Sequence, residues 1–139
     1  MATIDMQTMR YMNLLFRVAH VKAAKCFVYN NTIYFAVLPK LFSHALGPAN
    51  RNVRIISDQL GKRIRIIRDT NDDASGVSKF IESIVSPVSF VSLEIKDGSF
   101  VLTAGSRERA ATLIGRNKVR LEELSKVMES YFGKALKIV

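Results

Sequence analysis

The chain carries the same order of structural signals twice. Each copy centres on a short glycine-led loop between two helical segments, and the loops are Gly47-Pro48-Ala49-Asn50 and Gly115-Arg116-Asn117-Lys118. The helix after each loop ends at a further glycine, Gly61 in the first copy and Gly133 in the second. The second copy has four extra residues between its two glycines, about one turn of helix. Such a repeat indicates that the 139 residues form two small modules of the same kind.

Apolar spacing and turn residues predict the elements of the first copy. These are a helix over residues 3–19 capped by Thr3, strands Lys25–Tyr29 and Thr32–Leu38 around an Asn30-Asn31 turn, a short helix from Pro39, a helix ended by Gly61, and a strand Lys62–Arg68. Met6, Met9 and Met12 recur at helical spacing in the first of these helices. We interpret this methionine row as core packing.

The second copy repeats the pattern. Its elements are a helix Val77–Val85, strands Ser89–Lys96 and Ser99–Thr103 around an Asp97-Gly98 turn, a short helix capped by Ser106, a long helix ended by Gly133, and a strand Ala135–Val139. Each copy therefore has the order helix, strand, strand, helix, loop, helix, strand. The sequence predicts an α+β fold.

The net charge indicates a polyanionic partner. The chain carries 21 Lys and Arg against 12 Asp and Glu, a formal charge of +9. The excess is concentrated in residues 1–70, which have eleven basic and three acidic residues, whereas residues 71–139 have ten and nine. A strongly basic balance favours nucleic acid or, less directly, an acidic membrane surface.

The repeated order with a glycine-led loop between its two later helices resembles the type II KH domain. Two such modules, residues 1–70 and 71–139, with almost nothing else, resemble the archaeal NusA-like transcription factors. The resemblance is carried mainly by the stretches Leu46–Val53, Leu60–Arg63 and Ile114–Leu121. It implies binding of single-stranded RNA, because a KH loop with the pattern GXXG clamps the backbone of about four nucleotides. It also implies a role in transcription elongation and termination, with RNA polymerase as a further partner.

Both loops depart from the family pattern. Asn50 and Lys118 stand where the family has its second glycine, and Pro48 has no amide hydrogen to donate. Asparagine tolerates a left-handed backbone better than lysine does, whereas lysine brings an ammonium group that can reach a phosphate. The predicted RNA-binding residues are those of the two loops and the nearby cations: Gly47, Pro48, Ala49, Asn50, Arg51, Arg54, Lys62, Arg63, Arg65, Gly115, Arg116, Asn117, Lys118 and Arg120.

Catalysis has little support in the sequence. His20, His44 and the lone Cys26 show no spacing typical of a nucleophile with its base, and Asp72-Asp73 reads as a polar connector. We expect no enzyme, no cofactor, no metal site and no small-molecule substrate. The chain shows no signal peptide and no segment near the roughly 18 apolar residues of a membrane span, so we expect a cytoplasmic protein without a membrane partner.

Two other functions remain open. The altered loops are compatible with a protein–protein adaptor that keeps the KH fold but has lost the clamp. Type II KH modules also occur in ribosome-associated RNA-binding proteins. Single-stranded DNA is a further candidate ligand, because a phosphate clamp alone does not read the ribose 2′-hydroxyl group.

Overall fold

The computed structural model describes residues 6–139. The predicted cap Thr3 lies outside these residues. The chain divides into two compact units, the first ending at Asp69 and the second beginning at Thr70. Each unit contains helices and one small three-stranded sheet, so the fold is α+β, as predicted.

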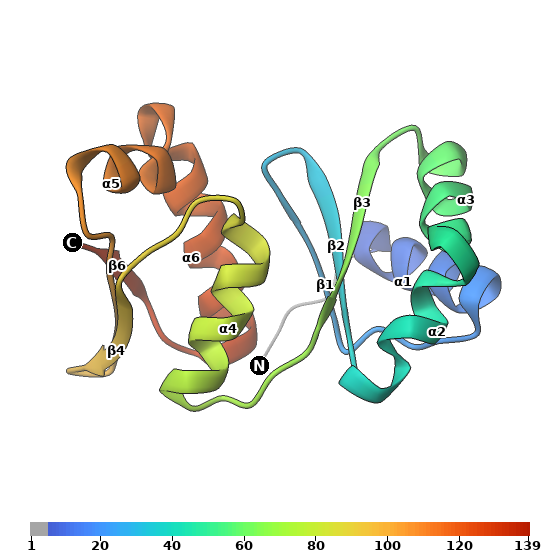
Figure 1. Cartoon of the computed structure of the whole chain (residues 1–139), viewed down its shortest axis with the longest axis horizontal. Coiled ribbons are helices and arrows are strands. Elements are labelled where there is room, and N and C mark those ends of the chain that lie inside the picture. Colours follow the sequence, from blue (N-terminus) through green and yellow to red (C-terminus); the bar gives the residue numbers. More distant parts are fainter. Residues whose placement is uncertain (1–5) are drawn as a thin grey trace. The chain divides into compact units, whose positions relative to one another are not determined.

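The first unit covers one face of its sheet with three helices (Figure 1). Its strands have the order β1-β2-β3, in which β2 pairs antiparallel with β1 and parallel with β3. Its elements are α1 (Met6–Ala19), β1 (Lys25–Tyr29), β2 (Thr32–Val37), α2 (Phe42–Leu46), α3 (Arg51–Leu60) and β3 (Arg63–Arg68). Because β3 lies at the edge of the sheet, one side of its backbone has no partner strand among residues 6–69.

Two turns of the first unit confirm the prediction made from their residues. Asn30 and Asn31 both have a positive φ, 49° and 59°, and join β1 to β2. Gly61 ends α3 in a left-handed conformation, with its amide donating to the carbonyl of Ser57. Local backbone requirements therefore set both reversals.

The core of the first unit lies between the sheet and the helices. α1 contributes Tyr11, Leu14, Leu15 and Ala19, which pack with buried strand residues such as Phe35. The prediction that the methionine row packs in the core is wrong for its first two members, because Met6 and Met9 are exposed. Helical spacing shows which residues share a face, but the buried face of α1 is the one that carries the leucines.

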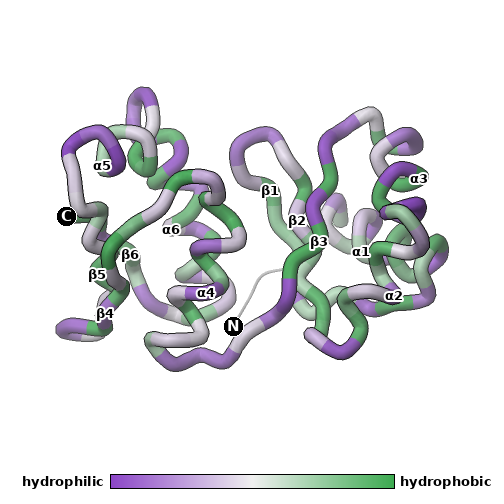
Figure 2. Tube along the Cα trace, in the orientation of Figure 1, coloured by the Kyte–Doolittle hydropathy of each residue, from purple (hydrophilic) through white to green (hydrophobic). Residues whose placement is uncertain are grey.

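The second unit repeats this arrangement. Its strands have the order β4-β5-β6, again antiparallel and then parallel. Its elements are α4 (Ala74–Val85), β4 (Ser92–Lys96), β5 (Ser99–Thr103), α5 (Arg107–Ile114), α6 (Val119–Phe132) and β6 (Leu136–Ile138). The connector that leads from β3 into α4 is hydrophilic (Figure 2).

Aromatic contacts hold the core of the second unit together. The ring of Phe132 on α6 meets Phe80 of α4 at 5.4 Å and Phe100 of β5 at 6.0 Å, both edge to face. Capping side chains set the helix starts, because Asp73 accepts from the amide of Gly76 and Ser106 accepts from the amide of Arg109. The Ser106 cap was predicted, whereas the Asp73 cap was not.

The strand predicted over Ser89–Lys96 is shorter in the structure. β4 starts at Ser92, and of the alternating apolar residues Val91, Leu93 and Ile95 only Leu93 is buried. Val91, which precedes β4, is 65% exposed and Ile95 is 41% exposed, and β4 is an edge strand of its sheet. Alternation therefore predicted the strand but not its start or which of these residues are buried.

Candidate nucleic-acid interface

The two glycine-led loops have nearly identical backbones. Gly47 has φ 76° and ψ 173°, and Gly115 has φ 76° and ψ 172°, a region that is essentially restricted to glycine. The third and fourth residues of both loops are left-handed: Ala49 (φ 51°, ψ 36°), Asn50 (φ 59°, ψ 30°), Asn117 (φ 56°, ψ 27°) and Lys118 (φ 61°, ψ 21°). The residues that replace the second glycine thus occupy the conformation that a glycine would favour.

Each loop is closed by the same backbone hydrogen bond. The amide of Asn50 donates to the carbonyl of Gly47, and the amide of Lys118 donates to the carbonyl of Gly115, each at 3.2 Å. The leading glycines in turn end the preceding helices, with their amides donating to Ser43 and Ala111. Both loops therefore connect two helices through a fixed turn.

A side chain five residues after the leading glycine supports each loop. Asn52 Nδ2 donates to the carbonyl of Ala45 at 3.1 Å and to that of His44 at 3.3 Å. Arg120 Nη1 reaches the carbonyl of Thr112 at 3.5 Å. In both units this side chain occupies the space beside the glycine that a Cβ atom would need.

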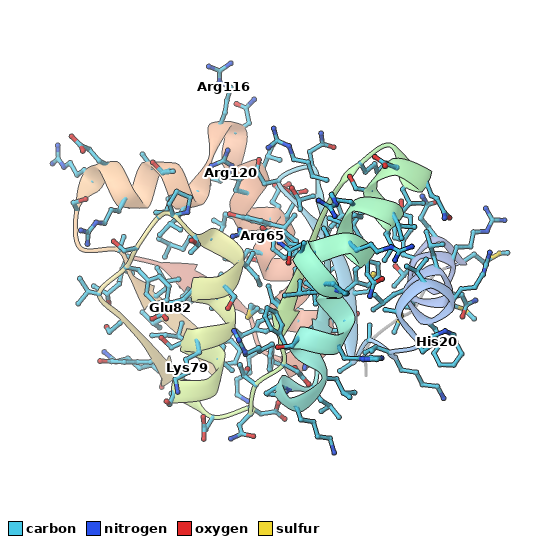
Figure 3. The ribbon with its side chains drawn as sticks, turned by 45° about the vertical axis from the view of Figure 1, so that its right-hand side comes forward. His20, Arg65, Lys79, Glu82, Arg116 and Arg120 are labelled. Carbon is cyan, nitrogen blue, oxygen red and sulfur yellow. The ribbon has the colours of Figure 1, made fainter. Side chains whose placement is uncertain are left out.

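These supporting residues were not recognised from the sequence. Asn52 was not a predicted site residue, and Arg120 was predicted as a phosphate contact. The structure directs the Arg120 side chain back onto α5 and the loop (Figure 3). The available signal was the spacing, because Asn52 follows Gly47 by the same distance along the chain as Arg120 follows Gly115.

The second loop carries its own cations. Arg116 and Lys118 are exposed, and Figure 3 shows Arg116 pointing away from the ribbon. Within residues 6–139 neither side chain forms an ion pair. Because the loop leads into the first turn of α6, these cations add to the positive end of a helix dipole, which favours an anion.

The first loop differs in its chemistry. Pro48, Ala49 and Asn50 are exposed and uncharged, and the cations are Arg51 and Arg54 on the first turn of α3. Both arginines are exposed. Two loops of the same shape therefore present different side chains, with charge inside the loop in one unit and on the following helix in the other.

The basic residues around β3 lie apart from the first loop. Lys62 and Arg63 follow the C-terminus of α3, whereas the loop precedes its N-terminus, and a ten-residue helix is about 15 Å long. Together with Asn31, Ser57, Asp58 and Gly61 they line an open polar depression. Arg65 is exposed on the edge strand (Figure 3). The predicted site residues of the first unit thus form two groups, one at each end of α3.

Aromatic stacking on bases has no support in the first sheet. Tyr29, Tyr34 and Phe35 are all buried, as expected from their strands. Among the described residues, no three His, Cys, Asp or Glu side chains gather in a way that would hold a metal ion. Nor does the described part contain a helix long and apolar enough to cross a membrane.

Comparison with known proteins places the chain near NusA-like proteins at low identity. No protein-family model matches it. It is 23% identical over 132 residues to the "Probable transcription termination protein NusA" of Halococcus morrhuae, a match that covers 94% of this chain and 92% of the relative. The crystal structure of APE1850 matches 98% of this chain and all of its own with a TM-score of 0.67 at 21% identity. The structural match shows a shared fold, and the sequence match extends over nearly the whole chain.

Proposed function

We propose that the chain is an RNA-binding transcription factor that holds single-stranded RNA through two tandem type II KH domains. The observation that carries this proposal is the repeated loop. Residues 47–50 and 115–118 adopt the same glycine-led turn before a helix, with exposed cations in or directly after it. A turn of this kind presents a helix N-terminus to a phosphate.

The topology of each unit supports the assignment to KH domains. In both units the first two strands form an antiparallel hairpin, and the last strand pairs parallel with the second strand of that hairpin. The glycine-led loop sits between the two helices that precede the last strand. We take residues 1–70 and 71–139 as the two domains.

The process is inferred from the relative. The similar protein of Halococcus morrhuae is named for transcription termination, and the match covers most of both chains. We therefore propose that this chain binds nascent RNA in the cytoplasm during elongation and termination, with RNA polymerase as a second partner and without catalysis. The excess of positive charge in residues 1–70 supports a nonspecific electrostatic contribution to RNA affinity.

The test is a binding titration with short labelled RNA, single-stranded DNA and duplex RNA over a range of salt concentrations. Arg116→Gln/Lys118→Gln removes two charges from the second loop, and Lys79→Gln removes a charge from α4 as the matched control. If both loop cations contact phosphates, the loop variant lowers the slope of log affinity against log salt by about 1.4, since each single-strand phosphate contact contributes about 0.7. The control leaves the slope unchanged.

Lys118→Gly separates charge from loop shape. Glycine adopts the left-handed conformation of residue 118 without strain, so this variant keeps the turn and loses the lysine side chain with its charge. Arg51→Gln/Arg54→Gln gives the corresponding measurement for the first unit. Equal RNA binding by the wild type and all loop variants at low salt contradicts the clamp. Absence of any RNA binding favours the adaptor, and preference for duplex RNA favours a ribosome-associated protein.

A further inference from the structure

Helix α1 exposes a row of large apolar side chains that its own unit does not cover. Met9 and Phe16 are 52% and 46% exposed, and Met6 is more exposed still. Met9 and Phe16 are seven residues apart, so they lie on the same side of the helix, about 10.5 Å from each other along its axis. The proposed RNA contacts use none of these residues.

A row of cations runs beside the apolar row. Arg10 and Arg17 follow Met9 and Phe16 by one residue, have the same seven-residue spacing, and are exposed. Lys22 adds a third charge, with its Nζ 5.9 Å from the centroid of the Phe16 ring. Residues 6–22 contain no Asp or Glu, so no carboxylate from this segment neutralises the row.

The exposed ring of Phe16 is held in position by its neighbours. The ring of His20, at the end of α1 (Figure 3), meets the Phe16 ring edge to face, with 6.3 Å between the ring centroids. The Nζ atom of Lys22 lies over the same ring. An aromatic side chain that is already oriented loses less conformational entropy when a partner covers it. Met9 complements it, because the flexible thioether side chain adapts to differently shaped partners.

We propose that α1 is a docking surface for an acidic amphipathic helix of a partner protein. The apolar ridge of the partner helix packs along Met9 and Phe16, and a neighbouring row of carboxylates meets Arg10 and Arg17. Electrostatic complementarity of this kind steers encounter and sets orientation, while burial of the apolar row supplies affinity. The surface favours protein over RNA, since the thioether of Met9 offers no flat face for a base and no hydrogen-bond donor for its edge.

The methionines provide a direct readout. The chain has five of them, and Met128 is fully buried in the second unit, so its methyl signal is an internal reference. The probe is a synthetic helical peptide of five turns with leucines along one face and glutamates flanking them. One control peptide has lysines in place of the glutamates, and a second has serines in place of the leucines. With ¹³C-methyl-methionine labelling of the full chain, we expect the acidic peptide to shift the Met9 signal and leave that of Met128 in place.

Two variants test the two rows separately. Met9→Ser/Phe16→Ser changes only exposed side chains, so it folds normally and binds the acidic peptide at least tenfold more weakly. Arg10→Glu/Arg17→Glu loses the acidic peptide and gains affinity for the lysine peptide. Met9→Ser/Phe16→Ser leaves the charge of the chain unchanged and keeps the RNA affinity of the wild type, which separates this proposal from the RNA clamp.

Four results overturn the proposal. The first is the absence of any Met9 shift at millimolar acidic peptide, and the second is equal Met9 shifts with the acidic and lysine peptides. The third is a Met9 shift caused by single-stranded RNA that competes with the acidic peptide. The fourth is a shift of the Met9 signal when the protein is diluted without peptide. The third assigns α1 to nucleic acid, and the fourth assigns it to contact with a second copy of the chain.

Discussion

Asn52 and Gly47 form a coupled pair whose energetics follow from the structure. A Cβ atom at position 47 would lie 2.9 Å from Asn52 Nδ2 and 3.0 Å from its Cγ. Asn52 therefore has to move in Gly47→Ala, and its hydrogen bonds to the carbonyls of His44 and Ala45 are lost with that movement. The variant also places alanine in a backbone region that only glycine adopts readily.

These contributions predict a specific pattern of free energies of unfolding. The backbone conformation costs about 2 kcal/mol and the lost hydrogen bonding about 1 kcal/mol, so Gly47→Ala destabilises by about 3 kcal/mol. Asn52→Ala loses only the hydrogen bonding, about 1 kcal/mol. The double variant loses each contribution once and is destabilised by about 3 kcal/mol, roughly 1 kcal/mol less than the sum of the single changes.

Urea unfolding followed by tyrosine fluorescence measures this coupling. The chain has no tryptophan, and three of its four tyrosines, Tyr11, Tyr29 and Tyr34, belong to the first unit, so the signal reports mainly on that unit. With a slope near 1 kcal/mol per molar urea, the coupling moves the midpoint of the double variant by about 1 M from the additive value.

Gly61→Ala is the matched control for this cycle. Gly61 also has a positive φ, 63°, but among the described residues beyond its chain neighbours no atom lies within 4 Å of the position that its Cβ would take. It lies about 13 Å along α3 from Asn52, so Gly61→Ala and Asn52→Ala should add within about 0.5 kcal/mol. Strict additivity in the Gly47 cycle as well would refute the role of Asn52 beside the glycine.

Two further changes test features of the individual units. Gly76 is the third residue of α4, and its Cβ would be 2.9 Å from the carbonyl carbon of Asn71 and closer still to the oxygen. We expect Gly76→Ala to lower the free energy of unfolding by about 2 kcal/mol and to lower the melting temperature accordingly. The neighbouring change Ser75→Ala should leave the melting temperature unchanged or raise it. A higher melting temperature for Gly76→Ala would contradict the close approach to Asn71. Lys25 and Asp69 form an ion pair with side chains only 11% and 17% exposed, so Lys25→Met leaves a partly buried carboxylate and costs about 2 kcal/mol in urea unfolding. Lys25→Met/Asp69→Leu should lower the free energy of unfolding less than Lys25→Met does. A double variant that is less stable than Lys25→Met would count against this account.

The reversals of the chain were predictable because single residues determine them. The positive φ values at Asn30, Asn31, Gly98 and Gly61 occur at the residue types that tolerate them best. Such requirements act within two or three residues and do not depend on the remainder of the fold. For the same reason the Ser106 cap could be assigned, since its partner amide is only three residues away.

The buried face of α1 was not predictable in the same way. Met9 and Phe16 are large apolar residues, as are Leu14 and Leu15, and Met9 and Phe16 lie on one side of the helix at a spacing of seven residues. Which set is buried depends on where β1, α2 and α3 meet the helix, and residues far away in the sequence decide this. Periodicity identifies a helix, but a helix with apolar residues on two sides leaves its orientation open.

The sequence predicted the positions of the two loops but not the side chains that support them. Glycine at positions 47 and 115 marks the turns, whereas the sequence signal for Asn52 is only its spacing from Gly47. Its role depends on a contact with the carbonyl ends of the preceding helix, which only the folded turn creates. The same applies to the contact of Arg120 with the carbonyl of Thr112, while its predicted phosphate contact stays a prediction.

The shared backbone of the two loops limits how this protein can change during evolution. The left-handed residues Ala49, Asn50, Asn117 and Lys118 exclude β-branched side chains and favour glycine, asparagine and other flexible or small residues. Within that limit the side chains are free to diverge, because the leading glycine and the residue five places later hold the turn. Duplicated modules can therefore acquire different ligand preferences by a few loop substitutions without rebuilding either fold, and a search for the two-glycine pattern alone overlooks them.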